Sequence, residues 1–201
     1  MKILLSSHAF YPGLGGLESV SEVLAGEWSR RGHEVRVVTR TPGGNKPEWN
    51  FGVIRNPRPR EFWALARWCD VFFHNNISLQ SAWPLLLVRR PWVVAHQTWI
   101  ARTDGSRNWQ DRLKRLFLRR AVNVSISRAI AESLPVDSVV IPNPYDETVF
   151  RPIPGVPRDK AIVFLGRLVS DKGADLLMEA LGLLKAEGVT PGLTVVGTGP
   201  R

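Results

Sequence analysis

The sequence predicts an α/β fold: a doubly wound parallel sheet in a Rossmann-like domain, followed by an incomplete second Rossmann-like domain. Short apolar segments typical of buried parallel strands alternate with amphipathic segments typical of helices. The alternation stops once, in the proline-rich stretch 151–160, and then resumes. We therefore expect an N-terminal domain at 1–150, a linker at 151–160, and the first βαβ unit of another domain at 161–201.

The elements of the first domain follow in order. Residues 2–7 (KILLSS) are an apolar strand. Residues 16–32 are a helix, because Leu17, Val20, Leu24 and Trp28 recur on one stripe and Gly32 suits the C-terminal end. The same reasoning predicts further strands at 33–40, 51–57, 69–76, 91–97, 123–127 and 138–144, and further helices at 60–68, 81–90, 108–121 and 128–134.

After the linker the pattern predicts a strand at 161–168, a helix at 174–188 and a strand at 192–200. Strands this apolar need cover on both faces and neighbours on both edges. About 40 residues is also close to the lower limit for an independent domain. We expect that 161–201 cannot fold alone and that either the first domain or a second copy of the chain orders it. A second copy is favoured, because unfinished parallel strands present open edges.

The composition limits the class of protein. With 201 residues, 44% of them hydrophobic and 22% charged, the chain is long enough for a sizeable core. The single cysteine, Cys69, excludes an internal disulfide framework and a Cys-rich zinc site, and we expect it to be a packing residue. The start, MKILLSSHAF, is too short for a signal-peptide core, and no apolar run approaches the ~20 residues of a membrane span, so we expect a cytoplasmic chain.

The net charge of +9 predicts anionic partners. The charge is concentrated at 112–120 (RLKRLFLRR), where a helical period puts Leu113, Leu116 and Phe117 on one face and Arg112, Arg115 and Arg119 on another. A solvated helix face and a peripheral membrane-binding patch both fit this pattern. Nucleic acid is disfavoured as a partner, because no nucleic-acid-binding motif accompanies the charge.

A glycine-rich loop, YPGLGGLE (11–18), joins the first strand to the first helix. Glycines there let the backbone approach a phosphate at a helix N-terminus, although a purely structural turn is the alternative. The loop is not the dinucleotide fingerprint, because Glu18 stands where a small residue is needed. The second strand also ends in VVTRTP, without the acid that would hold a ribose, so NAD is not predicted.

Three histidines lie at or just after the carboxyl ends of predicted strands, where open α/β sheets bind ligands: His8, His74 and His96. For each of them a structural histidine satisfied by its neighbours is the alternative. A stronger signal is GRLVSDKG, in which Arg167 and Lys172 follow a strand, stand beside glycines and precede a helix. An arginine fork and a lysine point charge suit a diphosphate, with a solvated pair as the alternative.

Four segments, in order, resemble the GT-B-fold retaining glycosyltransferases of family 4: FYPGLGGLE, VVAHQTW, VSISRAIAESL with VVIPNPYDETVFRP, and FLGRLVSDKGADLLMEAL with LTVVGTGP. The resemblance implies a nucleotide-sugar donor, a saccharide or lipid-linked acceptor, and a role in carbohydrate biosynthesis. It implies that Arg167 and Lys172 bind the donor pyrophosphate, that the loop at Gly15 and Gly16 faces the same phosphates, and that His96 lies near the transferred sugar. The two cations would then take the role otherwise given to a metal, so no metal cofactor is expected.

The sequence departs from the family in one large respect. The family's second domain contains a pair of glutamates that contact the donor, and no matching region is present here. We therefore expect an acceptor-side domain with the first unit of a donor domain, and the turnover of this chain is left open. The rival interpretation is a non-catalytic chain that binds an anionic or membrane partner through its basic surface. A titration with nucleoside diphosphates would separate the two.

Overall fold

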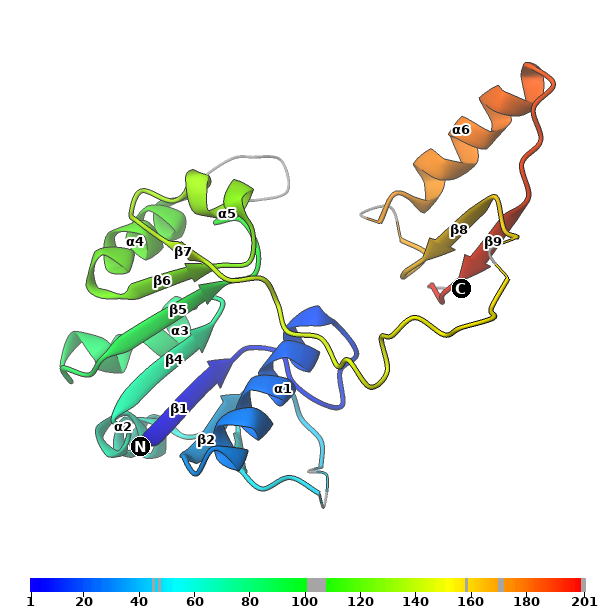
Figure 1. Cartoon of the computed structure of the whole chain (residues 1–201). Helices are drawn as coiled ribbons and strands as arrows, with labels where there is room; N and C mark the ends of the chain where they lie inside the picture. Colours follow the sequence, from blue (N-terminus) through cyan, green and yellow to red (C-terminus); the bar gives the residue numbers. More distant parts are fainter. Residues whose placement is uncertain (45, 47, 101–107, 158, 170–171, 200–201) are drawn as a thin grey trace. The chain divides into compact units, whose positions relative to one another are not determined.

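The computed structural model describes residues 1–44, 46, 48–100, 108–157, 159–169 and 172–199. The chain divides into two compact units, Met1–Glu147 and Thr148–Arg201. In the part described, unit 1 is built on a seven-stranded sheet in which every pairing is parallel (Figure 1). Its strands are β1 (Lys2–Ser7), β2 (Glu34–Thr39), β3 (Gly52–Arg55), β4 (Val71–Asn75), β5 (Trp92–His96), β6 (Val122–Ser125) and β7 (Val139–Val140).

The strand order is β3-β2-β1-β4-β5-β6-β7, which confirms the doubly wound sheet. The order reverses direction between β1 and β4, and ligands of such sheets bind outside the carboxyl ends of the strands at this point. The helices of unit 1 are α1 (Gly16–Arg30), α2 (Pro59–Trp68), α3 (Leu79–Ala82), α4 (Trp109–Phe117) and α5 (Arg128–Ser133), with 3₁₀ turns η1 (Trp83–Leu86) and η2 (Leu118–Arg120).

Two predicted elements are wrong in extent. The helix expected at 81–90 is instead the short α3, which ends at Ala82 and continues as η1. Pro84 has no N–H for an α-helical bond, and the chain tightens into a 3₁₀ turn around it. The strand expected at 138–144 is only β7, because Pro142 and Pro144 cannot donate to a sheet ladder.

The two faces of the sheet have separate apolar cores. On β1, Ile3 and Leu5 pack with the α1 side, whereas Leu4 packs with Phe62 and other apolar residues of α2 on the opposite side. This period of two is what a strand buried on both faces requires. The predicted packing role of Cys69 is confirmed. The side chain is fully buried in the α2 core, and this burial raises the pKa of the thiol to about 11, so it stays protonated at neutral pH.

A buried polar cluster fixes α1 against the carboxyl ends of two strands. The Ser21 hydroxyl of α1 donates to the Ser7 hydroxyl of β1 at 2.9 Å, and the Asn75 amide of β4 donates to the Ser21 hydroxyl at 2.7 Å. The same amide also donates to the Leu17 carbonyl at 3.1 Å. Buried hydrogen bonds of this kind hold a helix in one position, so the start of α1 and the glycine loop before it are fixed relative to the sheet.

The basic helix α4 is oriented differently from the prediction. Leu116, expected on the buried face, is 56% exposed, and Arg115, expected on the solvated face, is half-buried. The Arg115 guanidinium donates to the Ser133 carbonyl at 3.1 Å. The exposed side of α4 and η2 therefore carries a mixed set of apolar and basic residues: Trp109, Arg112, Leu116, Arg119 and Arg120.

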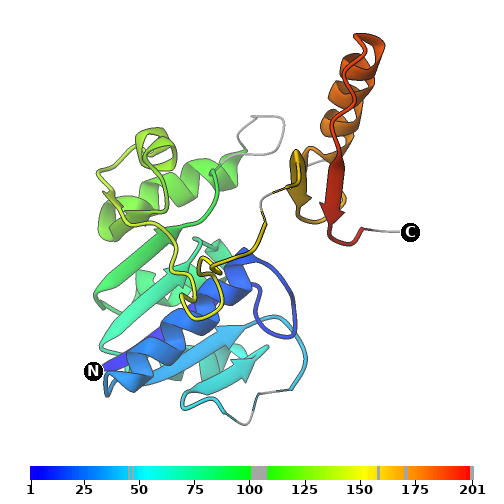
Figure 2. The same ribbon diagram turned by 45° about the vertical axis from the view of Figure 1, so that its right-hand side comes forward.

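Unit 2 is a single βαβ unit of β8 (Ile162–Leu165), α6 (Ala174–Ala186) and β9 (Leu193–Val196), drawn in orange and red in Figure 2. β8 and β9 pair in parallel, with Ile162 opposite Leu193. The helix α6 lies along this two-stranded sheet (Figure 1), and Phe164 of β8 and Leu177 of α6 line an apolar pocket between them. No described residue of unit 2 is fully buried. On β8, Val163 and Leu165 are exposed, so the unit has an apolar surface of the kind that folded domains normally cover.

We predict that a second copy of the chain covers this surface. The Leu165→Lys variant should then abolish a concentration-dependent dimer, because a lysine would lose its hydration in the interface. Light scattering gives the mass, and amide hydrogen exchange at 161–199 reports the protection. Leu14→Lys in unit 1 is the matched control, since Leu14 is even more exposed. A monomeric protein that is strongly protected at 161–199 would contradict the prediction.

Candidate functional site

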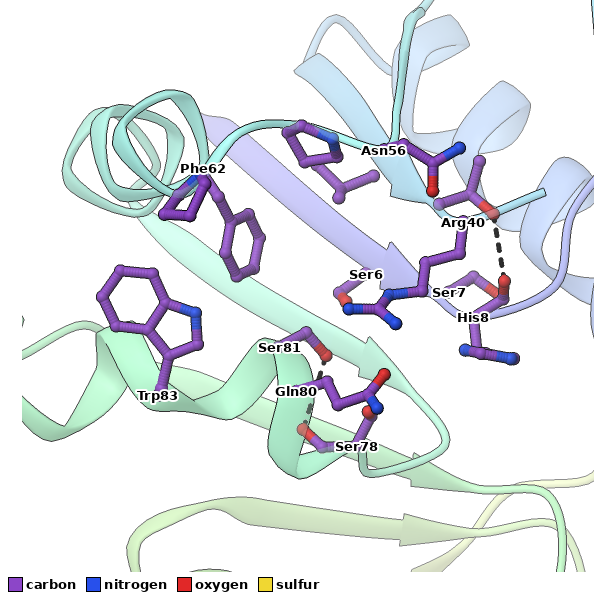
Figure 3. Close-up of a pocket in the computed structure, with 14 residues that line it drawn as sticks. Ser6, Ser7, His8, Arg40, Asn56, Phe62, Ser78, Gln80, Ser81 and Trp83 are labelled. Carbon is purple, nitrogen blue, oxygen red and sulfur yellow. Dashed lines mark hydrogen bonds between the residues drawn. The ribbon is translucent and has the colours of Figure 1, made fainter. Parts of the chain in front are cut away.

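A pocket of about 420 Å³ opens at the carboxyl ends of β1 and β2 (Figure 3). Residues from the β3–α2 connection, α2, α3 and η1 complete its walls. It is lined by Ser6, Ser7, His8, Val38, Thr39, Arg40, Asn56, Pro57, Pro59, Phe62, Ser78, Gln80, Ser81 and Trp83. The pocket therefore lies at the edge of the sheet where a doubly wound fold binds its ligands.

The glycine loop lies at the same edge, and its two predicted site glycines differ in their surroundings. A Cβ on Gly15 would lie 2.5 Å from Oε2 of Glu18, so the Glu18 carboxylate already occupies the space beside Gly15. A Cβ on Gly16 would meet nothing within 4 Å. A side chain at position 15 would displace the Glu18 carboxylate, which is the flexible end of its side chain. At Gly16, the first residue of α1, only an approaching ligand would require the absence of a side chain.

Arg55 of β3 holds the glycine loop in place. Its guanidinium donates to the Tyr11 carbonyl at 2.9 Å, to the Thr41 carbonyl at 2.7 Å and to the Gly44 carbonyl at 2.7 Å. The loop after β1 and the loop after β2 are thereby tied together at one cation. A guanidinium with several donors suits such a junction better than the single ammonium of a lysine.

His96, the predicted catalytic residue, lies at the carboxyl end of β5 and is fully buried. Its Nε2 is 3.0 Å from Oδ1 of Asn123, and the Asn123 amide donates to the Leu118 and Ala121 carbonyls at 3.0 Å each. These two bonds fix Oδ1 toward the histidine. Because Oδ1 can only accept, Nε2 carries the proton and Nδ1 is an acceptor.

The Nδ1 atom of His96 is buried and has no hydrogen-bond partner among the described residues. Burial lowers the pKa of His96, and the hydrogen bond to Asn123 opposes this shift only in part. The imidazole is therefore neutral at pH 7 and can accept one more hydrogen bond at Nδ1. It does not line the pocket at β1 and β2, so the structure does not bring His96 together with the residues there.

His74 is a structural residue. It is fully buried on β4, where its Nδ1 accepts from Nε1 of Trp92 at 2.9 Å and its Nε2 lies 2.8 Å from the Ser81 hydroxyl. Both ring nitrogens are satisfied. Burial lowers the pKa of His74 from 6.5 to about 3, so the ring is neutral at physiological pH. His8, in contrast, is exposed and lines the pocket.

We predict that unit 1 loses stability as the pH falls below about 6.5. The unfolded chain binds a proton at His74 there, whereas the folded chain does so only near pH 3. Where the unfolded state binds more protons than the folded state, the free energy of unfolding decreases as the pH falls. His74 alone should lower the free energy of unfolding by up to about 1.4 kcal/mol per pH unit in this window. Urea unfolding at pH 7 and pH 5, followed by tryptophan fluorescence, measures this change. All 8 tryptophans lie in unit 1, so the signal reports that unit alone.

The His74→Asn variant keeps an acceptor for Trp92 but has no group that titrates in this range. Its loss of stability between pH 7 and pH 5 should therefore be smaller than that of the wild type. His8→Asn, at an exposed position, is the matched control and should keep the wild-type dependence. An unchanged pH dependence in His74→Asn would show that other groups cause it.

Arg167 and Lys172 lie where the sequence predicts, between the carboxyl end of β8 and the start of α6. Both side chains are exposed. Gly173 caps α6 in the left-handed conformation, with φ at 74°, a conformation that most other residues adopt only at a cost. Gly173 thus allows a sharp turn between Lys172 and the first residue of α6. The N-terminus of this 13-residue helix carries a partial positive charge next to Lys172.

Sequence reasoning did not identify Arg40, Ser6 and Trp83 of the pocket, nor Asn123 beside His96. Arg40 follows β2 directly, so the carboxyl-end rule that selected the histidines applies to it as well. The other residues become visible only when the topology brings separate segments together. No group of three or more side chains suited to a metal ion occurs among the described residues.

No family model and no curated protein matches this sequence. Several solved structures match it in fold, and two examples match along nearly the whole chain. One is the crystal structure of WaaG, a glycosyltransferase involved in lipopolysaccharide biosynthesis, with a TM-score of 0.58 and 16% identity over 98% of this chain and 70% of WaaG. The other is the wall teichoic acid polymerase TagF, with a TM-score of 0.51 and 13% identity over 100% of this chain and 55% of TagF.

This chain therefore shares its fold with WaaG and TagF, which agrees with the GT-B fold that the sequence predicts. Identities of 16% and 13% establish the fold and not the chemistry, because one fold supports many activities. The membership of family 4 stays a prediction. In the described part of the chain, no helix is both long and apolar enough to cross a bilayer.

Proposed function

We propose that this chain belongs to a glycosyltransferase that moves a sugar from a nucleotide-sugar donor to a saccharide or lipid-linked acceptor. The observation that carries the proposal is the pair of cations, Arg167 and Lys172, on the β8–α6 turn of a chain with this fold. WaaG and TagF, which share the fold, are a glycosyltransferase and a wall teichoic acid polymerase. The resemblance to family 4 supports transfer with retention of the anomeric configuration.

In the proposed reaction, the bond between the anomeric carbon of the donor sugar and the diphosphate oxygen breaks, a bond to an acceptor hydroxyl oxygen forms, and the proton of that hydroxyl passes to the departing diphosphate. Negative charge then grows on the departing diphosphate. Arg167 and Lys172 stabilise this charge, a role that a metal ion performs in other transferases. Gly16 leaves room for the backbone at the start of α1 to approach a phosphate, and no metal cofactor is part of the proposal.

A titration of the protein with UDP, GDP, CDP and ADP tests the proposal. Isothermal titration should detect binding of at least one of them, with nucleoside monophosphates clearly weaker. Incubation with the matching nucleotide-sugars should release the diphosphate, and NMR of a transferred product should show the donor's anomeric configuration. Failure of all four diphosphates to bind would overturn the proposal. A product of inverted configuration would overturn only retention.

A second proposal concerns the place of action: we propose that the chain attaches to an anionic membrane surface through α4 and η2. The exposed side of these elements combines an indole, a leucine and three arginines: Trp109, Leu116, Arg112, Arg119 and Arg120. Trp109 is 69% exposed. Amphipathic aromatic rings and cations are what membrane interfaces favour, and a lipid-linked acceptor would be found there.

We predict that the variant Arg112→Gln, Arg119→Gln, Arg120→Gln binds anionic vesicles about 100-fold more weakly at low salt. Each cation near an anionic bilayer contributes on the order of 1 kcal/mol, which is about fivefold in affinity. The matched control is Arg30→Gln, Arg31→Gln, Arg36→Gln, which removes the same number of positive charges. These three arginines are paired with acidic residues of unit 1. Vesicle sedimentation gives the affinities. Equal loss in both triple variants, or equal binding to neutral vesicles, rules against a specific patch.

A further inference from the structure

The pocket at the carboxyl ends of β1 and β2 has two chemically different walls. Phe62 and Trp83 lie together on one side of it, and hydrogen-bonding side chains lie on the other (Figure 3). The apolar wall is rigid, because the Trp83 ring stacks on Trp63 with centroids 5.8 Å apart and meets the edge of Phe62 at 6.2 Å. The polar wall includes Ser6, Arg40, Asn56, Ser78 and Gln80.

One aromatic wall and one hydrogen-bonding wall match the two kinds of surface of a pyranose ring. Its axial C–H groups form an apolar face that packs on an indole, and its hydroxyls donate and accept around the rim. A cavity of about 420 Å³ is large enough for one or two sugar rings. The shape and the lining therefore favour a saccharide over a purely apolar ligand.

The charge of the lining residues restricts the class of saccharide that the pocket could bind. Arg40 is the one arginine or lysine among the described residues that line the pocket, and none of them is an aspartate or glutamate. The Arg40 guanidinium has no hydrogen bond or ion pair to the described residues, and Figure 3 shows its side chain on the same side of the pocket as the serines. The first turn of α2, with Pro59 and Phe62 in the lining, adds the positive end of a ten-residue helix.

The backbone on both sides of Arg40 is held in place. The Thr39 hydroxyl donates to the His8 carbonyl at 3.2 Å, and the Thr39 carbonyl accepts from the Asn56 N–H at 2.9 Å. The Thr41 hydroxyl accepts from the Phe10 N–H at 3.0 Å. The fold thus fixes the backbone at Arg40, while the side chain is exposed and its guanidinium is available to a ligand.

Ser6 adds a hydrogen-bonding group to the polar wall of the pocket. The residue as a whole is only 5% exposed, but in the described part of the chain its hydroxyl is not among the buried polar atoms that lack a partner, so the hydroxyl is open to the pocket. It can therefore donate to a ligand and accept from it. A ligand hydroxyl or anionic oxygen held between Ser6 and Arg40 would satisfy both groups together.

We infer that this pocket binds a sugar ring that carries an anionic group, either a phosphate or a carboxylate. In the reaction proposed above this sugar is the acceptor; that role rests on the proposed function, whereas the binding itself does not. The aromatic wall receives one face of the ring, and the Arg40 guanidinium forms a bidentate, charge-assisted pair with the anionic group.

The test is a binding measurement on the intact chain without nucleotide, by isothermal titration and ligand-observed NMR. The probes are glucose 6-phosphate, glucuronate, glucose and inorganic phosphate. A charged sugar should bind at least about 10-fold more tightly than glucose, the effect of roughly one charge-assisted hydrogen bond. Preference for glucose 6-phosphate identifies the phosphate as the anionic group, and preference for glucuronate identifies the carboxylate.

Arg40→Gln should remove the preference for the charged sugar, and Ser6→Ala should weaken binding of the same sugar. Arg58→Gln is the matched control, because Arg58 is an exposed cation directly before α2 that does not line the pocket. Equal binding of glucose and the charged sugars, no binding of any sugar, or inorganic phosphate binding as tightly as glucose 6-phosphate would overturn the inference. Nucleoside-diphosphate binding is measured separately, so a failure of the proposed transferase function is distinguishable from a failure of this pocket.

Discussion

Replacing Lys172 or Arg167 with alanine is expected to weaken nucleoside-diphosphate binding about 10- to 100-fold in each case. A charge-assisted hydrogen bond contributes roughly 1.5–3 kcal/mol, which corresponds to this range in affinity. Both residues lie on one strand-to-helix turn, after β8 and before α6. The transfer rate should fall together with the affinity, because the same cations stabilise the departing diphosphate.

Lys185→Ala is the matched control for this prediction. It removes one exposed lysine from the last turn of α6, at the opposite end of the helix from Lys172. Its diphosphate affinity should stay within about twofold of the wild type, since surface charges of this kind contribute little. The double variant of Arg167 and Lys172 should lose less than the sum of the single losses if both cations hold the same diphosphate. Unchanged affinity in both single variants would remove these residues from the donor site.

The sheet of unit 1 could be predicted because its signal is local. Parallel strands buried on both faces are short apolar runs, and Ile3, Leu4 and Leu5 of β1 divide between the two cores as this pattern requires. The errors occur where one residue changes the local geometry. Pro84 turns a predicted helix into a 3₁₀ turn, and Pro142 and Pro144 shorten β7.

The orientation of α4 could not be read from the spacing of leucines and arginines alone. Asn108 and Asp111 form a capping box at the start of this helix, and the Asp111 side chain is buried. A buried residue at 111 places Arg115 and Leu118 on the same inner face, four and seven positions later. The Arg115 guanidinium is accommodated there because backbone carbonyls accept its hydrogen bonds. The capping box is a sequence signal that predicts this orientation once it is recognised.

The pocket could not be predicted from the sequence, because its residues come from separate segments of the chain. Ser6, Arg40 and Trp83 come from β1, the β2 end and η1, and only the strand order places these segments at one edge. Each residue alone is compatible with an ordinary surface or core position. The hydrogen bond between Asn123 and His96 could not be predicted either. It depends on the register of β6 beside β5, in which His96 lies opposite Ser125.

Replacing Asn123 with aspartate is expected to convert His96 from a neutral acceptor into a cation. Asn123 now fixes the proton on Nε2, and burial keeps the pKa of His96 low. A carboxylate at the same position would favour the imidazolium and raise that pKa, so Nδ1 would become a donor at neutral pH. If His96 accepts a hydroxyl of the transferred sugar at Nδ1, as the family resemblance implies, transfer should slow by about 10- to 100-fold, the effect of one lost hydrogen bond in a buried site.

The ¹⁵N chemical shifts of the His96 ring give the protonation state of each nitrogen directly, independently of activity. In the wild type Nδ1 should be unprotonated at pH 7, and in Asn123→Asp it should be protonated, with the loss of activity reversing as the pH rises. Ser138→Ala is the matched control, because it removes a partner of the Ser125 hydroxyl on the same strand as Asn123 without touching His96. A protonated Nδ1 in the wild type would show that the tautomer is assigned wrongly. Full activity in an Asn123→Asp protein whose His96 is charged would show that Nδ1 does not accept a hydrogen bond during transfer.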